Sequence, residues 1–406
     1  MLAVVATTFS PAVSVSLAQS PDGDANVRLM SKVERPHHRV CSASHGQDLA
    51  HCQAHVVEDG NGHPAATTGP VGYGPAQFRT AYGLPSAAAT SQVIGIVDAF
   101  NDPTIKTDLD NYSTQFGLPL LPNCAGPISS SGVPCFQKVD QNGGTNYPPT
   151  DSGWALEIAL DVEVAHAVCP NCSILLVEAT SSTFANLLAA EDRAVSMGAK
   201  EVSNSWGANE FSSETSFDSH FNHAGVAFTV SSGDSGFGAE YPSSSRFVTS
   251  VGGTSLRINS NNSYNSESAW SGGGSGCSSF ETKPAFQPAV SGCSRRVTAD
   301  VSADADPNTG AAVLDTTPIS GQSGWFQVGG TSLSSPLVAA VYALAGGVAP
   351  AVQGNSVPYS LHNSSNMHDV TTGNNGRCRR TPVLCNAGVG FDGPTGLGSP
   401  NGVGAF

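Results

Sequence analysis

Apolar runs rich in β-branched residues alternate with helical patterns from about residue 73 onward, and this alternation constrains the fold more than any other feature. The runs that read as strands are 92–100, 173–180, 201–206, 226–233, 247–253 and 296–303. Helical patterns occupy 152–168, 184–198 and the residues after Thr331. Continuous apolar strands separated by helices are typical of a parallel sheet covered on both faces. The sequence therefore predicts one α/β domain over residues 73–406.

The first 72 residues have a different character. Residues 1–18 are apolar and rich in small residues, and Ser16-Leu17-Ala18 resembles a signal-peptidase site, although no Lys or Arg precedes Arg28. We interpret 1–18 as a secretory signal and 19–72 as a short N-terminal extension or a reduced propeptide. No later segment offers the roughly 20 uninterrupted apolar residues of a membrane span. We therefore expect a secreted, extracellular protein without a membrane partner.

Charged residues make up only 12% of the chain, against about 25% in a typical soluble domain. The formal net charge is -15, which disfavours binding to nucleic acid and to anionic membranes. Most of this charge disappears when carboxylates take up protons, and a protein with few ion pairs has little to lose in acid. The composition fits an acidic working environment.

Ten cysteines fall into five pairs of near neighbours. These pairs are Cys41/Cys52, Cys124/Cys135, Cys169/Cys172, Cys277/Cys293 and Cys378/Cys385. Sequence alone does not fix the connectivity, and local pairing is the simplest prediction for an exported protein. A zinc site at Cys169-Pro-Asn-Cys172 is the weaker interpretation, because no second such motif accompanies it.

Ser332 stands at the start of a helical pattern in GGTSLSSP. The preceding glycines permit a tight turn, and a helix N-terminus offers free N–H groups that favour developing negative charge. Ser332 is therefore a candidate nucleophile. An ordinary helix cap is the alternative, because Ser and Thr are preferred at that position.

The preceding helix carries a candidate base. Glu157 and Asp161 are four residues apart in ALEIALD and share one helix face. Their repulsion should raise one pKa, so that the pair holds a shared proton. Glu163 and His166 point elsewhere, and we interpret both as structural. Glu157 is then the predicted general base, with Asp161 orienting it.

Asp234 follows a predicted strand in VSSGDSG. A carboxyl group there can donate a hydrogen bond to an oxyanion when acid or a raised pKa keeps it protonated. An ordinary turn aspartate is the alternative.

The motifs ALEIALD, SSGDSG and GGTSLSSP, in this order, resemble the sedolisin family, the serine-carboxyl peptidases. The resemblance covers about residues 72–406 and implies a subtilisin-like fold. It also implies that Ser332 is the nucleophile, Glu157 the base, Asp161 its partner and Asp234 the oxyanion donor. Family members usually carry a long folded propeptide, and here only the short segment 19–72 precedes the catalytic region.

Other stretches resemble supporting parts of the same family. VSNSWG (202–207) and SGGGSG (271–276) resemble the two strands that hold substrate backbone. Asp98 and Trp206 resemble residues that link to the glutamate. The acidic cluster Asp300, Asp304 and Asp306 is interpreted as a structural turn rather than a metal site.

The C-terminal motifs HDVTTG and GVGFDGPTGLGSP resemble the sedolisin calcium site. The implied ligands of one ion are the carboxylates of Asp369 and Asp392 and the carbonyl oxygens of Val370, Gly388 and Gly390. Oxygen-only ligands suit a hard cation such as calcium. A glycine-rich turn with capping aspartates is the alternative.

The sequence thus predicts a secreted, calcium-binding, monomeric endopeptidase that cuts polypeptides in acid. A conventional Ser-His-Asp peptidase on the same fold and a catalytically dead binding protein remain alternatives. Glu240, just before Tyr241-Pro242, is a candidate for the first substrate pocket.

Overall fold

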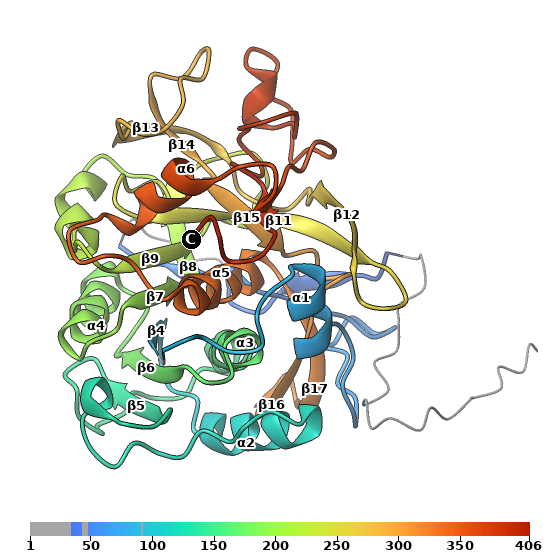
Figure 1. The fold of residues 1–406 in the computed structure, drawn as a ribbon. Coiled ribbons are helices and arrows are strands. Elements are labelled where there is room, and N and C mark those ends of the chain that lie inside the picture. The colour runs from blue at the N-terminus through green and yellow to red at the C-terminus, as the bar shows by residue number, and fades with distance from the viewer. Residues whose placement is uncertain (1–33, 43–47, 91) are drawn as a thin grey trace, which may run out of the picture.

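A largely parallel sheet forms the centre of the computed structural model, which describes residues 34–42, 48–90 and 92–406 (Figure 1). Its strand order is β12-β11-β9-β7-β4-β6-β5, with β15 added beside β11. Every pairing in it is parallel except that of β11 with β12. The strands are β4 (Val93–Ala99), β5 (Phe136–Asp140), β6 (Ser173–Ala179), β7 (Glu201–Asn204), β9 (Ala227–Ser231), β11 (Thr249–Ile258), β12 (Tyr264–Ala269) and β15 (Val301–Asp304). The predicted parallel α/β sheet is confirmed.

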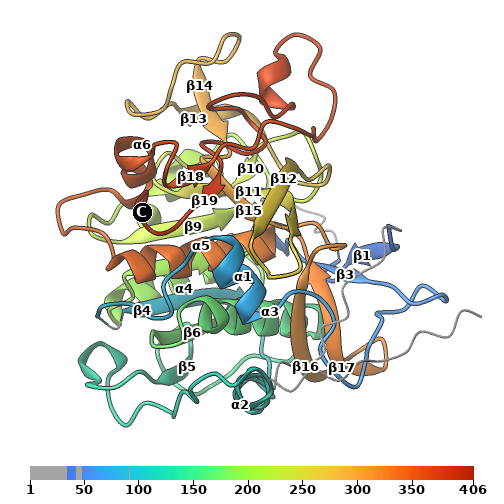
Figure 2. The ribbon, with the colours of Figure 1, turned by 45° about the vertical axis from the view of Figure 1, so that its right-hand side comes forward.

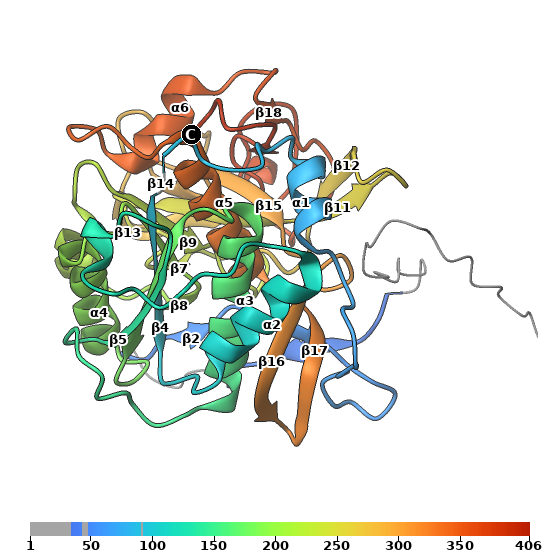
Figure 3. The same ribbon diagram turned by 60° about the horizontal axis from the view of Figure 1, so that its bottom comes forward.

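Helices cover both faces of this sheet (Figures 1 and 3). On one face lie α3 (Ser152–Val168) and α5 (Thr331–Ala345), and on the other lies α4 (Phe184–Ser196). Strand β4 shows how the chain divides its side chains: Ile94 and Ile96 pack toward α3 and α5, whereas Val97 packs in the core beside α4. Because strand side chains alternate, Asp98 belongs to the α3 face. This alternation brings a carboxyl group at a strand end to the helix that carries Glu157.

The start of α3 is fixed by Asp151, whose side chain accepts hydrogen bonds from the N–H groups of Gly153 and Trp154. Every residue from Gly153 to Val168 is buried. A helix that is apolar all round is a core helix, so any carboxyl group on it is withdrawn from water. The disulfide Cys169–Cys172 links its end to β6.

A second sheet joins the N-terminal segment to the hairpin that precedes α5 (Figure 2). Its order is β1-β3-β17-β16, formed by β1 (His37–Arg39), β3 (His55–Val57), β17 (Gln322–Gly329) and β16 (Ala311–Ile319). A smaller sheet has the order β10-β8-β2, formed by β10 (Glu240–Tyr241), β8 (Trp206–Asn209) and β2 (His51–Cys52). Residues 37–39 and 51–57 therefore pair with the main body along two sheet edges.

The remaining elements lie around this framework. The helices are α1 (Pro75–Ala81), α2 (Ile105–Phe116) and α6 (Val357–Leu361), and the strands are β13 (Gly276–Thr282), β14 (Arg295–Thr298), β18 (Met367–His368) and β19 (Ser399–Pro400). Among the described residues, no helix is both long enough and apolar enough to cross a membrane. The predicted signal at 1–18 lies outside the described residues.

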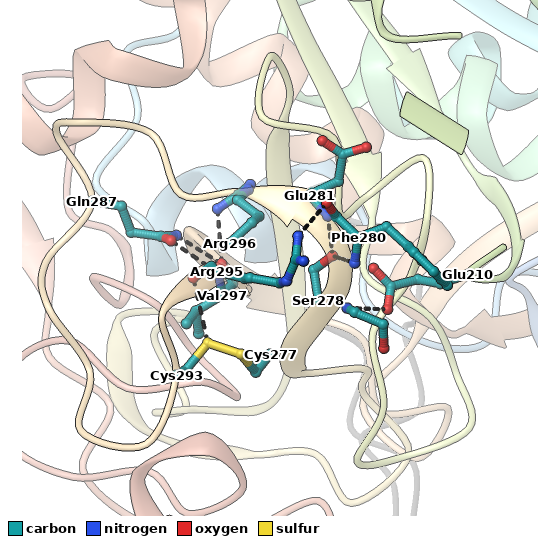
Figure 4. The surroundings of a disulfide bond; sticks show 11 residues. Glu210, Cys277, Ser278, Phe280, Glu281, Gln287, Cys293, Arg295, Arg296 and Val297 are labelled. Atoms are coloured by element: carbon teal, nitrogen blue, oxygen red, sulfur yellow. Dashed lines mark hydrogen bonds between the residues drawn. A yellow bond between two sulfur atoms is a disulfide. The ribbon is translucent and has the colours of Figure 1, made fainter. Parts of the chain in front are cut away.

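All five predicted disulfides are present, so Cys169 and Cys172 are not zinc ligands. Cys277–Cys293 bridges β13 to the loop before β14 (Figure 4). In the same hairpin, Arg295 donates to the carbonyl of Phe280 at 2.6 Å. The disulfide and this hydrogen bond hold a polar hairpin that buries little apolar surface of its own.

Some elements differ from those expected. The run 296–303 divides into two strands, β14 and β15, that belong to different sheets. The β16–β17 hairpin and α2 were not predicted, because their sequences mix polar and apolar residues without a long apolar run. Their burial depends on contacts with α3, which only the folded chain supplies.

The acidic cluster at 300–306 is structural, as predicted. Arg296 is fully buried and forms an ion pair with Asp300. It also donates to the carbonyl oxygens of Val248 and Val297, at 3.2 and 2.8 Å. Asp304 accepts from Thr309 at 2.6 Å.

We expect Arg296→Met to lower the free energy of unfolding by about 3–5 kcal/mol, because it leaves the carboxylate of Asp300 buried without its cation. The neighbouring Arg295→Met, at an exposed position, should cost less than about 1 kcal/mol. Denaturant unfolding at one pH measures both. Equal losses would show that the buried pair has no special role.

Candidate active site

The four predicted catalytic side chains come together between α3, α5 and the carboxyl ends of β4 and β9. Ser332 is the second residue of α5, and Glu157 and Asp161 lie on the facing side of α3. Asp234 follows β9, and Asp98 is the last residue but one of β4. The carboxyl ends of parallel strands gather at one edge, which is where α/β proteins place their sites.

The turn before α5 depends on Gly330, which has φ 97°. A Cβ atom there would lie 2.1 Å from the carbonyl oxygen of Gln53 and 2.5 Å from Oδ2 of Asp234. A larger residue is therefore excluded both by its backbone conformation and by space. The same contacts show that Asp234 Oδ2 and the carbonyl oxygen of Gln53 face one small volume beside Ser332.

Glu157, Asp161 and Asp98 are fully buried. Burial, and then repulsion from neighbouring carboxyl groups of the cluster, raises the pKa of Glu157 and of Asp161 well above the usual range. Burial, and then repulsion from Glu178, raises the pKa of Asp98 to about 8. The hydroxyl of Ser332 opposes this rise in the pKa of Glu157. Three carboxyl groups therefore lie close together in the interior, and their raised pKa values favour the protonated forms.

Ser205 connects the carboxyl cluster to the serine. Its hydroxyl donates to Asp161 Oδ1 at 2.9 Å and approaches the carbonyl oxygen of Ser332 at 3.4 Å. The hydroxyl of Ser332 lies 3.4 Å from the carbonyl oxygen of Ser205. Both oxygens of Glu157 lack a hydrogen bond of standard geometry within the described residues. The carboxyl group of Glu157 is thus close enough to the hydroxyl of Ser332 for the serine to influence its pKa.

Asp234 is held by the residue before the serine. Oδ1 accepts from both the N–H and the hydroxyl of Thr331, each at 2.8 Å. Burial raises the pKa of Asp234 to about 7, so the carboxyl group is protonated in acid. Oδ2 is the oxygen that faces Gln53, and it is therefore the atom placed to donate a proton.

His55 also enters this site, which the sequence did not indicate. Its Nε2 lies 3.6 Å from Asp234 Oδ2. Burial, its largest influence, lowers the pKa of His55 to about 3. Imidazole and carboxyl group are therefore both neutral over the acidic range, and their contact is not an ion pair.

The other side chains of α3 are structural, as predicted. His166 contacts the carbonyl oxygen of Pro119 through Nε2 at 2.9 Å, on the far side of the helix from Glu157. Glu163 accepts from the N–H of Leu314 at 2.9 Å. Trp206 differs from its expected link to the glutamate, because its indole N–H donates to the carbonyl of Val97 at 3.0 Å. It thereby fixes the strand that carries Asp98.

The C-terminal loops bring the two predicted calcium-binding carboxyl groups together. Asp392 is buried, and burial is the main cause that raises its pKa to about 7, with repulsion from Asp369 adding to it. Asp369 accepts from the N–H of Gly390, and Asp392 accepts from the N–H of Gly388 at 2.8 Å. No group of three or more His, Cys, Asp or Glu side chains in the described ranges suits a metal. The expected site needs only two carboxylates, supplemented by carbonyl oxygens.

Comparison with known proteins agrees with this geometry. A model of the subtilase family matches residues 143–383. The solved structure of Pseudomonas sedolisin, described as a serine-carboxyl proteinase complexed with two molecules of pseudo-iodotyrostatin, is 30% identical. The alignment covers 82% of this chain and 96% of that one, with a TM-score of 0.67. The chain belongs to the sedolisin family.

Two curated relatives of this sedolisin-family chain are sedolisin from Pseudomonas sp. (strain 101) and kumamolisin from Bacillus sp. (strain MN-32). The first is 30% identical over 81% of this chain, and the second is 28% identical over 91%. The matches span 60% and 67% of the two relatives. The chain thus covers about three fifths of the first relative's length.

Many buried carboxyl groups of this chain have raised pKa values. Burial raises the pKa of Glu201 to about 8, and that of Glu178 to about 7. The corresponding pKa values in an unfolded chain are about 4. At pH values between the unfolded pKa values and these folded ones, the carboxyl groups of the folded state hold more protons than those of the unfolded state. The free energy of unfolding therefore falls as the pH rises through this range.

We therefore expect the free energy of unfolding to be greatest near pH 4 and to fall continuously toward pH 8, measured by thermal or denaturant unfolding. A group whose pKa differs by one between the folded and unfolded states contributes about 1.4 kcal/mol to this fall. Glu201→Gln, outside the site, should flatten the slope over this interval. A stability maximum near neutral pH would contradict the assignment.

Proposed function

We propose that the protein is a secreted serine-carboxyl endopeptidase that hydrolyses polypeptides in acid. The observation that carries the proposal is the cluster of three buried carboxyl groups beside a serine at a helix N-terminus. We further propose residues 1–18 as the signal, 73–406 as the peptidase domain of a monomer, and 19–72 as an extension or reduced propeptide.

In the proposed reaction the hydroxyl of Ser332 attacks the peptide carbonyl and passes its proton to Glu157. Asp161, oriented by Ser205, shares the proton and stabilises the charge. Glu157 then protonates the leaving amine, and water hydrolyses the acyl-enzyme through the same groups. The transfer requires an ionised Glu157 beside an Asp161 that keeps its proton, and repulsion within the buried pair favours this singly protonated state over the doubly ionised one.

The negative charge of the tetrahedral intermediate develops on the former carbonyl oxygen. The N–H of Ser332 and the protonated Asp234 are the proposed donors. The helix dipole of α5 adds a favourable field at the same point. Asp234 must keep its proton for this role, so its pKa of about 7 sets an upper pH limit.

We propose one calcium ion in the C-terminal loops, held by the carboxylates of Asp369 and Asp392 and the carbonyl oxygens of Val370, Gly388 and Gly390. The support is a set of possible ligands that are all oxygen atoms, in which burial, with repulsion from Asp369 adding to it, raises the pKa of Asp392. The ion would neutralise this repulsion and join the two loops.

A Ser-His-Asp mechanism is less well supported, because His166 is bonded on the opposite side of α3. His55 approaches Asp234, and burial lowers its pKa to about 3. A dead binding protein is less well supported because all four positions carry the expected residues.

Activity of the variants against a denatured protein substrate at acidic pH tests the roles. Ser332→Ala and Glu157→Gln should each lower kcat by at least about 10³-fold, whereas His166→Asn should keep kcat within a few-fold. Loss of activity in His166→Asn equal to that in Ser332→Ala, with an intact fold, would contradict a carboxyl base.

Asp234→Asn separates hydrogen-bond donation from titration. The amide can accept from Thr331 and donate toward the oxyanion at every pH, so activity near pH 4 should stay within about tenfold of the parent. Asp234→Ala should lose about 10²–10³-fold in kcat. A pH–rate profile over pH 3–8 measures both. Equal losses in the two variants would show that donation is not the role of Asp234.

Chelator treatment tests the calcium proposal. Removal of calcium should lower the midpoint of thermal unfolding, and added Ca²⁺ should restore it, because the ion binds the folded state. Asp392→Asn should abolish this calcium dependence, whereas Asp306→Asn, an acid outside these loops, should keep it. No shift with chelator in the parent would contradict the site.

A further inference from the structure

Two segments of this acidic chain carry positive charge and no carboxyl group. Residues 282–298 and 371–391 together hold six of the 17 Lys and Arg residues and none of the 32 Asp and Glu residues. The chain as a whole has a formal net charge of -15, so the excess of positive charge is local. A surface of this kind attracts an anionic partner, whereas the rest of the protein repels it.

Five of the six cations lie at the surface, and Arg296 alone is buried, in its ion pair with Asp300. Within residues 34–42, 48–90 and 92–406, none of the five forms an ion pair with a carboxylate. Arg295, for example, donates to the carbonyl oxygen of Phe280 (Figure 4). We call the five together the basic patch, and they are Lys283, Arg295, Arg377, Arg379 and Arg380.

The carboxyl groups that border the basic patch offset little of its charge in acid. Glu281 on β13 is buried, and burial is the main cause that raises its pKa to about 8. Asp369 and Asp392, which flank residues 371–391 in the chain, are the proposed calcium ligands. Glu210 accepts from the N–H of Ser279 at 2.9 Å, and one carboxylate beside five cations leaves a net positive charge.

The two basic segments are held together as one rigid unit. A disulfide closes each of them, and both disulfides pack in one small apolar cluster with Val297 and Leu384. A Cβ atom on Gly292 would lie 2.5 Å from Oγ1 of Thr381, so the two loops touch. They lie side by side at the top of the molecule (Figures 1 and 2). A rigid surface loses little conformational entropy when it binds a partner.

The basic patch is fastened to one wall of the proposed substrate cleft. Residues 271–276 are one of the two stretches expected to hold substrate backbone. The side-chain amide of Asn375 donates to the carbonyl oxygen of Gly273 at 2.6 Å, and the hydroxyl of Ser275 donates to that of Leu384 at 2.6 Å. These two contacts stand on either side of the three arginines in the chain. A polypeptide that leaves this wall meets the patch within a few residues, because an extended residue spans roughly 3.3–3.6 Å.

We propose that the basic patch binds acidic stretches of the polypeptide substrate, so that the enzyme favours chains rich in Asp and Glu. The inference rests on the proposed function, which identifies residues 271–276 as part of the substrate cleft. Guanidinium groups stay charged throughout the acidic range and bind carboxylates through paired hydrogen bonds. Carboxyl groups of an unfolded chain have pKa values of about 4. The attraction is therefore present above this pH and is lost below it.

Binding of a labelled peptide in a Ser332→Ala background tests the patch without chemistry. The probes are fluorescein-labelled GEGEGEGEGE and its uncharged match GQGQGQGQGQ, followed by fluorescence anisotropy at pH 6 and low ionic strength. The Ser332→Ala protein should bind the acidic probe at least tenfold more tightly than the uncharged one. Adding Arg377→Gln/Arg379→Gln/Arg380→Gln should weaken the Kd of the acidic probe at least tenfold.

The matched control is Lys106→Gln/Lys200→Gln/Arg257→Gln, which removes the same charge outside the basic patch. It should keep the Kd of the acidic probe within about twofold, because screening limits the reach of exposed charges to about 10 Å at 0.1 M salt. Thermal unfolding verifies that both triple variants keep the fold. Equal Kd values in the two folded triple variants would overturn the proposal.

Nucleic acids and anionic membranes also carry negative charge, and they provide a competing outcome. The competitors are a single-stranded oligonucleotide with as many charges as the acidic probe and vesicles that contain phosphatidylglycerol. Phosphate groups stay ionised at pH 3, whereas the carboxyl groups of the probe do not, so the probe should be released between pH 6 and pH 3. Tighter binding of either competitor than of the acidic probe at pH 6 would overturn the proposal.

Digestion separates this inference from the proposed function. The active protein digests a denatured protein mixture at pH 5, and mass spectrometry gives the share of Asp and Glu beside the cleaved bonds. This share should be high in the parent and in the control triple variant, and it should fall in Arg377→Gln/Arg379→Gln/Arg380→Gln. If no form hydrolyses protein while the charge-dependent binding holds, the proposed function fails and the patch stands as a binding surface. If all forms hydrolyse it with the same share of acidic neighbours, the substrate preference fails and the peptidase stands.

Discussion

Burial of carboxyl groups without cationic partners is the constraint on which the site depends. Glu157 and Asp161 project from a helix that is buried along its whole length, and Asp98 reaches them from the end of β4. Ionising all three would place several charges in a medium that solvates them poorly, so protons are retained instead. The hydroxyl groups of Ser205 and Ser332 are the influences that oppose this retention. In the proposed mechanism the serine needs one of these carboxyl groups in its ionised form, while the others keep their protons.

Carboxyl groups are also buried outside the site. Buried Glu201 and Glu178 also have raised pKa values, and surface ion pairs are few because the chain has few charged residues. Acid therefore keeps the interior neutral and removes few favourable interactions. Stability and catalysis would share one pH range because both depend on protonated carboxyl groups.

The N-terminal segment is linked to the site through shared hydrogen-bonding groups. Ser332 offers its N–H to Gln53, and the edge of β8 offers its backbone to β2. An extended peptide satisfies these groups whether it comes from this chain or from another. In this structure β2 occupies the edge of β8, and Glu240 accepts a hydrogen bond from the side chain of Gln53.

The sequence by itself predicted the parallel sheet and helices α3, α4 and α5 from apolar periodicity, and the five disulfides as the simplest local pairing. Four-residue spacing placed Glu157 and Asp161 on one helix face, whereas their grouping with Asp234 and Ser332 was implied by the resemblance to the sedolisin family. Only the tertiary structure decided that His55 meets Asp234 and that Gln53 meets Ser332 and Glu240. Those contacts join residues that are far apart in the chain, and no local pattern encodes them. They depend on the pairing of β3 with β17. The β16–β17 hairpin mixes polar and apolar residues, so its sequence does not predict this pairing, which forms only when the domain folds.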